Sequence, residues 1–299
     1  MPMRSSPTTS GRRPEWVDGR QFPFASRFTE IDGNTVHYVD EGTGPAILFL
    51  HGNPTWSFVY RDAIASLMDR YRCIALDYPG FGLSTARAGY GGLPEEHAQV
   101  VVAFLDRLEL AGLTLAVQDW GGPIGMRAAE QRPERVARFV IGNTWAWPVN
   151  GDRHFSMFSS LMGGPPGRLL SERFNLFVNV MIPKGHRRRK VSSEELDQYR
   201  AALGTRERRR ATATFPRQII HGREFLAGVE TGLAGLVDRP ALIVWGDADI
   251  AFRDVERARW EAVFPDHCTV VLAGAGHYVQ SDAAADYAAA IRGWLVLPA

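Results

Sequence analysis

An aspartate at a tight turn between a strand-like and a helix-like segment is the first candidate for chemistry. Residues 117–122 read Val-Gln-Asp-Trp-Gly-Gly and connect an apolar run to helix-forming residues that begin at Pro123. Gly121 and Gly122 allow a helix to begin close to the strand, as a nucleophile elbow requires. The usual elbow carries Ser, whereas here the nucleophile position is Asp119. Because an isolated Asp before a helix is most often an N-cap, this motif needs support from elsewhere in the chain.

Two later motifs supply candidates for the rest of a catalytic triad. Residues 245–249 read Trp-Gly-Asp-Ala-Asp, and residues 274–277 read Gly-Ala-Gly-His. The order nucleophile, acid, histidine is that of the α/β-hydrolase triad, with His277 as the base and an Asp as the group that orients it. An Asp in such a loop is most often a turn former. We prefer Asp249 to Asp247 because the fold usually spaces the acid as Trp-Gly-x-x-Asp, and the three motifs in this order argue against coincidence.

An early loop supplies candidate donors for a negatively charged intermediate. His-Gly-Asn-Pro at residues 51–54 directly follows the apolar run 46–50. In this fold the loop and the residue after the nucleophile each offer a backbone N–H to an oxyanion hole, so Asn53 and Trp120 are the candidates. His51 is interpreted as a histidine that packs the loop rather than as a base.

The elements that must position these residues follow a strand–loop–helix rhythm. Residues 29–38 predict a hairpin around an Asp-Gly turn. Short, continuous apolar runs, typical of parallel strands buried on both faces, lie at residues 46–50, 73–76, 113–117, 136–141, 241–245 and 268–272. Helical stretches at residues 95–110, 123–130 and 283–295 separate most of them. The prediction is an α/β-hydrolase fold, a mostly parallel, doubly wound sheet entered through an antiparallel hairpin.

The segment between residues 141 and 241 is far longer than a crossover needs. We expect an inserted helical cap at residues 145–225, with the main domain formed by residues 22–144 and 226–299. Most apolar residues of the cap should pack it onto the main domain, and a few should line a cavity. These apolar residues are Phe155, Met157, Phe158, Met162, Phe174, Phe177 and Met181. The basic clusters at 187–190 and 206–210 are interpreted as a solvated outer face.

The overall composition excludes several classes of protein. With 45% hydrophobic and 22% charged residues and a net charge of +1, the chain reads as an ordinary globular protein with no polyanionic partner such as nucleic acid. Cys73 and Cys268 lack a metal-ligand or redox spacing and are interpreted as small core residues. Residues 1–21 are polar, without the apolar region of a signal peptide, and are expected to be a flexible leader. No apolar run reaches membrane-spanning length, so a cytoplasmic protein is expected.

Three of these segments together resemble the haloalkane dehalogenases. They are His-Gly-Asn-Pro-Thr-Trp-Ser at residues 51–57, Gln-Asp-Trp-Gly-Gly at residues 118–122, and the late His277. The resemblance extends from about residue 22 to the C-terminus and is weakest in the cap. It implies that Asp119 displaces a halide, that His277 activates water to cleave the ester, and that the side chains of Asn53 and Trp120 bind the halide.

The resemblance also indicates a branch and a set of partners. Some family members carry a Glu as the acid after the strand that corresponds to residues 136–141, but here residues 142–144 read Gly-Asn-Thr. An amide cannot serve as the acid, which favours the branch with an Asp-His-Asp triad and an Asn–Trp halide pair. Another branch uses a second, cap-derived Trp for halide. Trp145 and Trp147 leave that open, although we expect both to pack at the base of the cap.

The residue types agree with this chemistry. A carboxylate is ionised at neutral pH, so Asp119 can attack carbon directly. A halide is a weak base and needs donors rather than a general acid, and uncharged indole and amide donors suit a desolvated pocket. The implied partners are a small apolar halogenated substrate, halide ion and water. No metal or organic cofactor is required, and oligomerisation is possible.

Three alternatives remain open. An epoxide hydrolase shares the fold and the Asp–Trp elbow, but it needs cap tyrosines, and Tyr199 is the only tyrosine well inside this cap. Epoxide hydrolases also typically carry an aromatic residue in place of Asn53 and His in place of Gln118. A haloacid dehalogenase of this fold would need cations for the substrate carboxylate. A ligand-sensing, non-catalytic α/β-hydrolase would signal through a partner, whereas the complete triad with Asn53 favours turnover.

Overall fold

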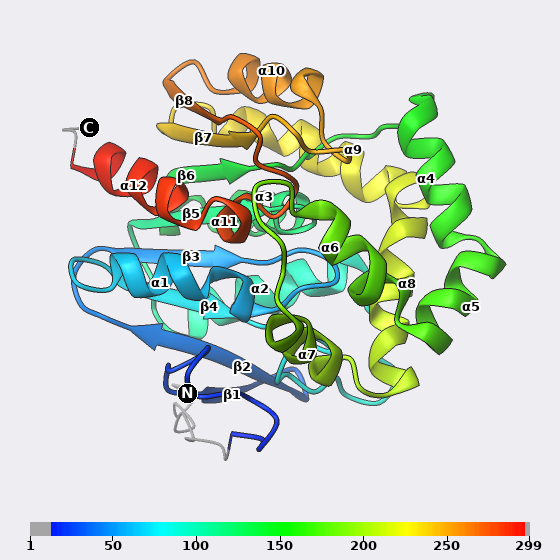
Figure 1. Ribbon diagram of the computed structural model, residues 1–299. Coiled ribbons are helices and arrows are strands. Elements are labelled where there is room, and N and C mark those ends of the chain that lie inside the picture. The colour runs from blue at the N-terminus through cyan, green and yellow to red at the C-terminus, as the bar shows by residue number, and fades with distance from the viewer. Residues whose placement is uncertain (1–12, 297–299) are drawn as a thin grey trace, which may run out of the picture.

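The computed structural model describes residues 13–296, which form an eight-stranded sheet in the order β1-β2-β4-β3-β5-β6-β7-β8 with helices on both faces (Figure 1). The strands β1 and β2 form an antiparallel hairpin, β2 is also antiparallel to β4, and all pairs from β4 to β8 are parallel. The bounds are β1 Arg27–Ile31, β2 Asn34–Glu41, β3 Ala46–Leu50, β4 Arg72–Leu76, β5 Leu113–Gln118, β6 Val136–Gly142, β7 Ala241–Gly246 and β8 His267–Leu272. The predicted fold class is therefore confirmed.

Burial on both faces explains the continuous apolar runs. In β3, Leu48 and Leu50 pack into the core beneath α2 (Pro94–Arg107) and α3 (Gly121–Gln131). Ile47 and Phe49 point to the opposite face and pack beneath α1 (Arg61–Leu67) and α12 (Ala284–Leu295). Because successive strand residues alternate between faces, a two-sided core needs an apolar residue at every position.

The edge strand β8 differs from this pattern. Most of β8 is exposed or half-buried, and Cys268 lies at its exposed start, so the prediction of a core cysteine is wrong there, whereas Cys73 in β4 is buried as predicted. An edge strand has a neighbour on one side only and leaves part of its surface to solvent.

The first described residues pack against the main domain. Val17 is buried, and the ring of Trp16 lies edge-on to Trp56 with ring centroids 5.8 Å apart. The backbone N–H of Asp18 donates to Oε1 of Gln198 over 3.1 Å. The expectation of a flexible leader is therefore wrong for residues 13–21, and residues 1–12 lie outside the described part of the chain.

A run of helices between β6 and β7 covers the carboxyl ends of the parallel strands (Figure 1). Local signals begin several of them: Asp152 caps α4, Ser192 forms a capping box with Glu195 at α7, and Thr205 caps α8. The helices are α4 Arg153–Gly163, α5 Pro165–Phe174, the π-helical η3 Phe177–Met181, α6 Ile182–Gly185, α7 Ser193–Ala202 and α8 Arg206–His221, followed by α9 Arg223–Gly232, which packs on α3. The division of the chain at residues 145 and 225 stays a prediction.

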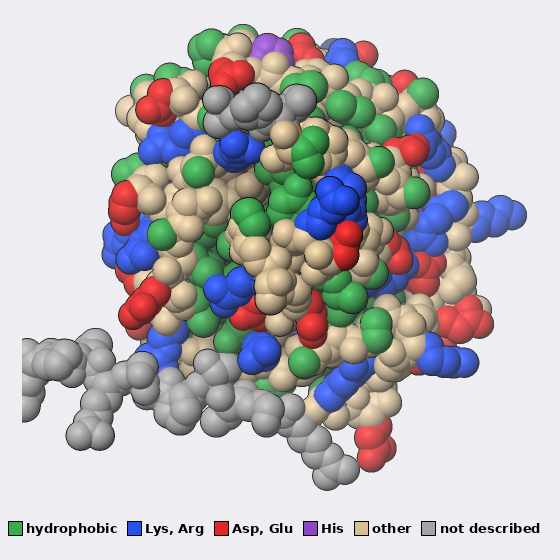
Figure 2. Space-filling view, turned by 90° about the vertical axis from the view of Figure 1, so that its left-hand side faces the viewer, with side chains coloured by type: hydrophobic (Ala, Val, Ile, Leu, Met, Phe, Trp, Pro, Cys, Tyr) green, Lys and Arg blue, Asp and Glu red, His purple; other side chains and the backbone are tan. Residues whose placement is uncertain are grey.

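The remaining short elements complete the connections. They are η1 Ser57–Tyr60, η2 Pro133–Arg135, η4 Leu233–Gly235, α10 Asp254–Val263 and α11 Val279–Asp282. Figure 2 shows the side of the molecule opposite the cap helices, where basic and acidic side chains are interspersed. None of the helices within residues 13–296 is long and apolar enough to cross a membrane.

Candidate active site

The turn after β5 places Asp119 at the centre of the carboxyl edge of the sheet. Asp119 has a φ of 50°, a left-handed conformation that is uncommon for a side-chain-bearing residue. The helix that follows begins in close contact with neighbouring backbone: a Cβ on Gly121 would lie 2.3 Å from the carbonyl oxygen of Leu50, and one on Gly122 would lie 2.9 Å from that of Trp145. Only glycine fits such positions, so the turn has the strained, crowded geometry of a nucleophile elbow.

Loop residues that follow β5, β7 and β8 meet at this turn. Nδ1 of His277 lies 3.0 Å from Oδ2 of Asp249, and its Nε2 lies 3.8 Å from Oδ2 of Asp119. All three side chains are buried. Asp247, the alternative acid, is exposed, and its Oδ1 accepts from the backbone N–H of Gly274 instead. The geometry therefore favours Asp249 as the partner of His277.

Burial and neighbouring charges shift the pKa of both ends of this arrangement. Burial alone would lower the pKa of His277, but the charge and hydrogen bond of Asp249, together with the charge of Asp119, raise it above its usual value. Burial raises the pKa of Asp119, while His277 and the backbone N–H groups of Trp120 and Asn53 partly offset that effect. The backbone donors and the imidazole favour the anionic form of Asp119 and oppose the effect of burial on its pKa.

The two oxygens of Asp119 have different surroundings. Oδ1 accepts from the backbone N–H of Asn53 over 2.7 Å. The backbone of Trp120 also donates to the carboxylate, so both predicted oxyanion donors lie at this group. Oδ2 lies toward His277. Oδ1 is therefore held by the backbone of the early loop, and Oδ2 is the oxygen nearer the imidazole.

His51 supports the early loop from below. Its Nδ1 lies 2.9 Å from the carbonyl oxygen of Gly52, and its Nε2 accepts from the backbone N–H of Tyr78 over 3.1 Å. Complete burial lowers its pKa to about 4, which keeps the ring neutral near pH 7. These contacts agree with a histidine that packs the loop.

Two amides that were not predicted as part of the site touch the triad. Nδ2 of Asn143 donates to Oδ2 of Asp249 over 2.9 Å, and its Oδ1 accepts from the backbone N–H of Gly246. Nε2 of Gln118 lies 3.1 Å from Nε2 of His277. The sequence carried a signal for both: Gln118 and Asn143 stand at the ends of adjacent strands β5 and β6, beside the predicted triad loops.

An apolar cavity of about 270 Å³ opens directly above Asp119. Asn53, Trp120 and His277 line its polar end. Cap residues form the opposite wall, among them Phe155, Met157, Phe158, Phe177 and Met181 from the apolar set singled out in the sequence. Of the remaining two, Met162 is buried elsewhere and Phe174 is exposed. The cavity suits a small, apolar molecule presented to the carboxylate.

The side chains of Asn53 and Trp120 lie together at the polar end. Nδ2 of Asn53 donates to the carbonyl oxygen of Thr212 over 3.2 Å, and its buried Oδ1 has no partner among the described residues. The ring of Trp120 lies against Trp145, with centroids 4.7 Å apart. Trp145 also lines the cavity, so it is more than base-of-cap packing, whereas the ring of Trp147 lies at a tilt against Trp260, 5.0 Å between centroids, outside the cavity.

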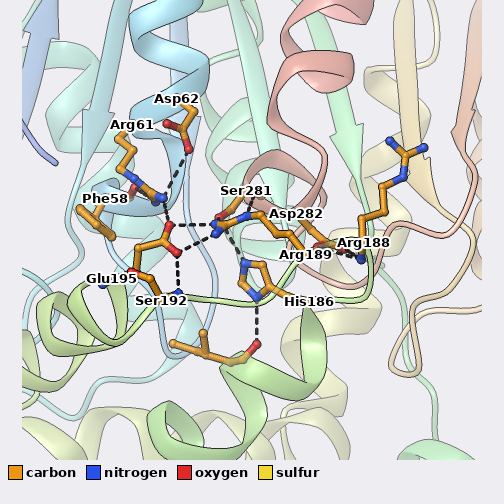
Figure 3. Close-up of polar contacts among 11 residues, drawn as sticks. Phe58, Arg61, Asp62, His186, Arg188, Arg189, Ser192, Glu195, Ser281 and Asp282 are labelled. Carbon is orange, nitrogen blue, oxygen red and sulfur yellow. Dashed lines mark hydrogen bonds and ion pairs between the residues drawn. The ribbon is translucent and has the colours of Figure 1, made fainter.

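The segment after α6 is fastened to the loop of His277 through Asp282. Figure 3 shows Asp282 beside Arg188 and Arg189 of this segment. The carboxylate of Asp282 accepts backbone N–H groups from residues 187–189 of the cap, and from Gly276, the residue before His277, over 2.7 Å. These donors lower the pKa of Asp282, although burial alone would raise it. One side chain thus fixes both segments.

Part of the basic clusters is built into the same contact. Arg189 pairs with Glu195, which also contacts Arg61 of the main domain (Figure 3). Burial would raise the pKa of Glu195, but these arginines and the backbone of Ser192 lower it to about 2. Arg208 donates to the carbonyl oxygen of Gly82 in the main domain over 2.6 Å. The interpretation of both clusters as a solvated face is therefore wrong for these residues, because they join the cap to the main domain.

The described residues contain no group of three His, Cys, Asp or Glu placed to hold a metal ion. The arrangement of nucleophile elbow, imidazole and backbone donors is that of an α/β hydrolase. The family model for the alpha/beta hydrolase fold matches residues 45–284.

Known proteins define the family more narrowly. Haloalkane dehalogenase 2 of Mycobacterium tuberculosis is 45% identical over 276 residues, which cover 92% of this chain and 96% of that protein. A cis-3-alkyl-4-alkyloxetan-2-one decarboxylase of Shewanella oneidensis is 31% identical over 270 residues, 87% of this chain and 85% of the relative. The crystal structure of haloalkane dehalogenase DbeA from Bradyrhizobium elkani superposes with a TM-score of 0.82 at 26% identity, covering 91% of this chain and 97% of that one. The chain is a hydrolase of the α/β-hydrolase family and belongs to the haloalkane dehalogenases.

Proposed function

We propose that this protein hydrolyses haloalkanes to alcohol and halide through a covalent alkyl ester on Asp119. The observation that carries the proposal is the division of labour between the oxygens of Asp119 at the polar end of an apolar cavity. Oδ1 is held by backbone N–H, and Oδ2 lies 3.8 Å from His277. An anionic oxygen facing an apolar cavity is suited to attack carbon rather than to bind a cation.

In the first step, Oδ2 of Asp119 forms a bond to the halogen-bearing carbon and the carbon–halogen bond breaks. The halide leaves with the bonding electrons and needs hydrogen-bond donors but no proton. The side-chain amide of Asn53 and the indole of Trp120 line the cavity at the end where it would leave. Neutral donors favour the departing charge without binding the product as tightly as a cation would.

In the second step, water attacks the carbonyl carbon of the ester while His277 takes its proton. The negative charge then develops on Oδ1, which already accepts from the backbone N–H of Asn53, and the backbone N–H of Trp120 also donates to this carboxyl group. Each such donor stabilises a transition state of this kind by about 3 kcal/mol. The bond between the carbonyl carbon and Oδ2 breaks, His277 returns the proton, and the alcohol leaves with Oδ2. Asp249 holds His277 in the tautomer with its proton on Nδ1.

The test is halide release from short terminal bromo- and chloroalkanes by the wild type, Asp119→Ala and the size-matched Asp119→Asn. We expect release by the wild type and a loss of at least about a thousandfold in both variants, with unchanged thermal unfolding midpoints. Halide release that survives in Asp119→Asn would contradict the proposal.

The same assay separates the alternatives. An epoxide hydrolase would open styrene oxide but release no halide. The cap tyrosine expected to protonate the epoxide, Tyr199, packs on Phe58 and does not line the cavity. Because some relatives are named as oxetanone decarboxylases, an alkyl oxetan-2-one is the third compound to test. Its consumption, without halide release from haloalkanes, would assign a decarboxylase activity instead. A ligand sensor would bind such compounds without turnover.

A further inference from the structure

The cap helix α8 contains a proline in its interior, and that proline leaves one backbone carbonyl without its helical donor. In an α-helix the N–H of each residue donates to the carbonyl four residues earlier. Pro216 has no N–H, so the carbonyl of Thr212, four residues before it, receives no bond from that position. Such a freed carbonyl in a buried place is expected to find another donor.

The donor it finds is the halide-binding candidate of the main domain. Nδ2 of Asn53 donates to the carbonyl oxygen of Thr212 over 3.2 Å, and both residues are buried. Asn53 and Pro216 both line the cavity, beside Trp120. One hydrogen of the amide NH₂ therefore goes to the cap helix, and the second remains for a group in the cavity.

The orientation of this amide decides whether it attracts or repels an anion. Rotation by 180° about its terminal bond exchanges an acceptor oxygen for the NH₂ group, and the backbone N–H of Asn53, which donates to Asp119, does not control that rotation. The carbonyl of Thr212 can only accept, so it selects the orientation with NH₂ toward α8. Oδ1, which has no partner among the described residues, is then directed away from the carbonyl.

We propose that Pro216 is a positioning residue for the halide site: by withholding an N–H, it frees the carbonyl of Thr212 to hold the amide of Asn53 as a donor. The inference rests on the proposed function, since it assigns halide to Asn53. The halide site then depends on both the main domain and the cap, because Asn53 of the main domain is the donor and the carbonyl of Thr212 in the cap holds it in place. Displacement of α8 would release the amide and weaken halide binding.

The experiment restores the missing N–H. In Pro216→Ala and Pro216→Val, the new N–H competes with Asn53 for the carbonyl of Thr212, and the valine keeps more of the apolar volume facing the cavity. Bromide titration, followed by tryptophan fluorescence, should show a dissociation constant about threefold to tenfold higher in both variants, as one lost hydrogen bond of this kind implies. Ile219→Ala is the control, because Ile219 lies on the same helix and lines the cavity but already has its N–H.

A double-mutant cycle with Asn53→Ala separates positioning from a general change of shape. Once the amide is gone, Pro216→Ala should no longer weaken bromide binding, whereas Ile219→Ala should have the same effect in both backgrounds. Bromide binding in Pro216→Val that equals the wild type, or an effect of Pro216→Ala that persists without Asn53, would overturn the proposal.

The titration does not depend on turnover, so the two proposals fail separately. A wild type that binds bromide but releases no halide from bromoalkanes would remove the proposed function and leave the cycle readable. If halide is released but Pro216→Ala weakens bromide binding equally with and without Asn53, only the proposed role of Pro216 is overturned.

Discussion

The floor and the roof of the cavity are built on different principles. On the floor, Asp119 and His277 follow β5 and β8, and Asp249, which follows β7, supports His277. Each of the three is fixed by hydrogen bonds of 2.7–3.0 Å to another residue. On the roof, aromatic and methionine side chains of the cap offer apolar contacts, and Met157 is 69% exposed and Leu161 65% exposed. Directional bonds fix the atoms that react, while non-directional contacts tolerate substrates of different shape.

Several polar contacts join the two regions. Asp282 ties the base of the cap to the loop of His277, Glu195 pairs with arginines on both sides, and the carbonyl of Thr212 holds Asn53. We therefore expect substitutions to have their largest effect on the floor, a smaller effect at these contacts and the smallest effect on the roof.

The largest effect in this series should follow from His277→Gln on the floor. The first step needs no base, so the variant should release about one halide per active site and then stop, with steady-state turnover reduced by about 10²- to 10⁴-fold. Rapid-quench measurement of halide gives the burst. Absence of the burst together with loss of turnover would mean that His277 also serves the first step.

The next effect concerns pH. Asp249 raises the pKa of His277, so Asp249→Asn should lower it. His277 acts as a base only when neutral, and the acid limb of the pH profile should therefore move to lower pH, while the plateau rate falls by up to about 10⁴-fold because the productive tautomer is lost. Single-turnover ester hydrolysis measured against pH tests this, with Asp247→Asn as the exposed control. An unmoved or upward-shifted limb in Asp249→Asn would contradict the account.

At the contact between the two regions, Asp282→Asn replaces one acceptor oxygen with an NH₂ group among four backbone donors. We expect about 1–3 kcal/mol of lost stability and a loss of turnover no greater than about tenfold. Denaturant unfolding and steady-state kinetics measure both. Asp286→Asn, which removes an exposed ion pair with Arg188, is the matched control and should change stability by less than about 1 kcal/mol. Equal effects of the two variants would remove the special role of Asp282.

On the roof, Phe158→Leu should alter substrate preference more than turnover. The half-buried side chain lines the cavity and makes only apolar contacts there, so KM for chloroalkanes of different length should change by a few-fold, within the range of one methylene contact. A loss of turnover as large as that of His277→Gln would break the distinction between floor and roof.

The same distinction explains what the sequence could predict. Asp119, Asp249 and His277 each follow an apolar strand in a short loop, and parallel strands end at one edge, so a motif of a few residues was sufficient. The role of Thr212 depends on two distant features. Pro216, four residues later, frees its carbonyl, and that carbonyl contacts Asn53, which lies 159 residues earlier in the chain. No local sequence pattern encodes this contact.

The incorrect expectations share that cause. Cys268 lies in an apolar run that forms an exposed edge strand. Residues 13–21 have the composition of a polar leader, but Val17 packs them against the main domain. Arg189 pairs with Glu195, which also binds an arginine of the main domain. In each case the outcome depends on a neighbour that is distant in sequence, because tertiary packing overrides the local pattern.

The proposed mechanism requires that Asp119, rather than water, attacks the carbon. A single turnover with excess enzyme in H₂¹⁸O tests it directly, since in the proposed mechanism the alcohol leaves with Oδ2 of Asp119 and water replaces that oxygen. We expect unlabelled alcohol and one ¹⁸O in the peptide that contains Asp119. Labelled alcohol from the first turnover, with no label in that peptide, would show direct attack by water and contradict the account.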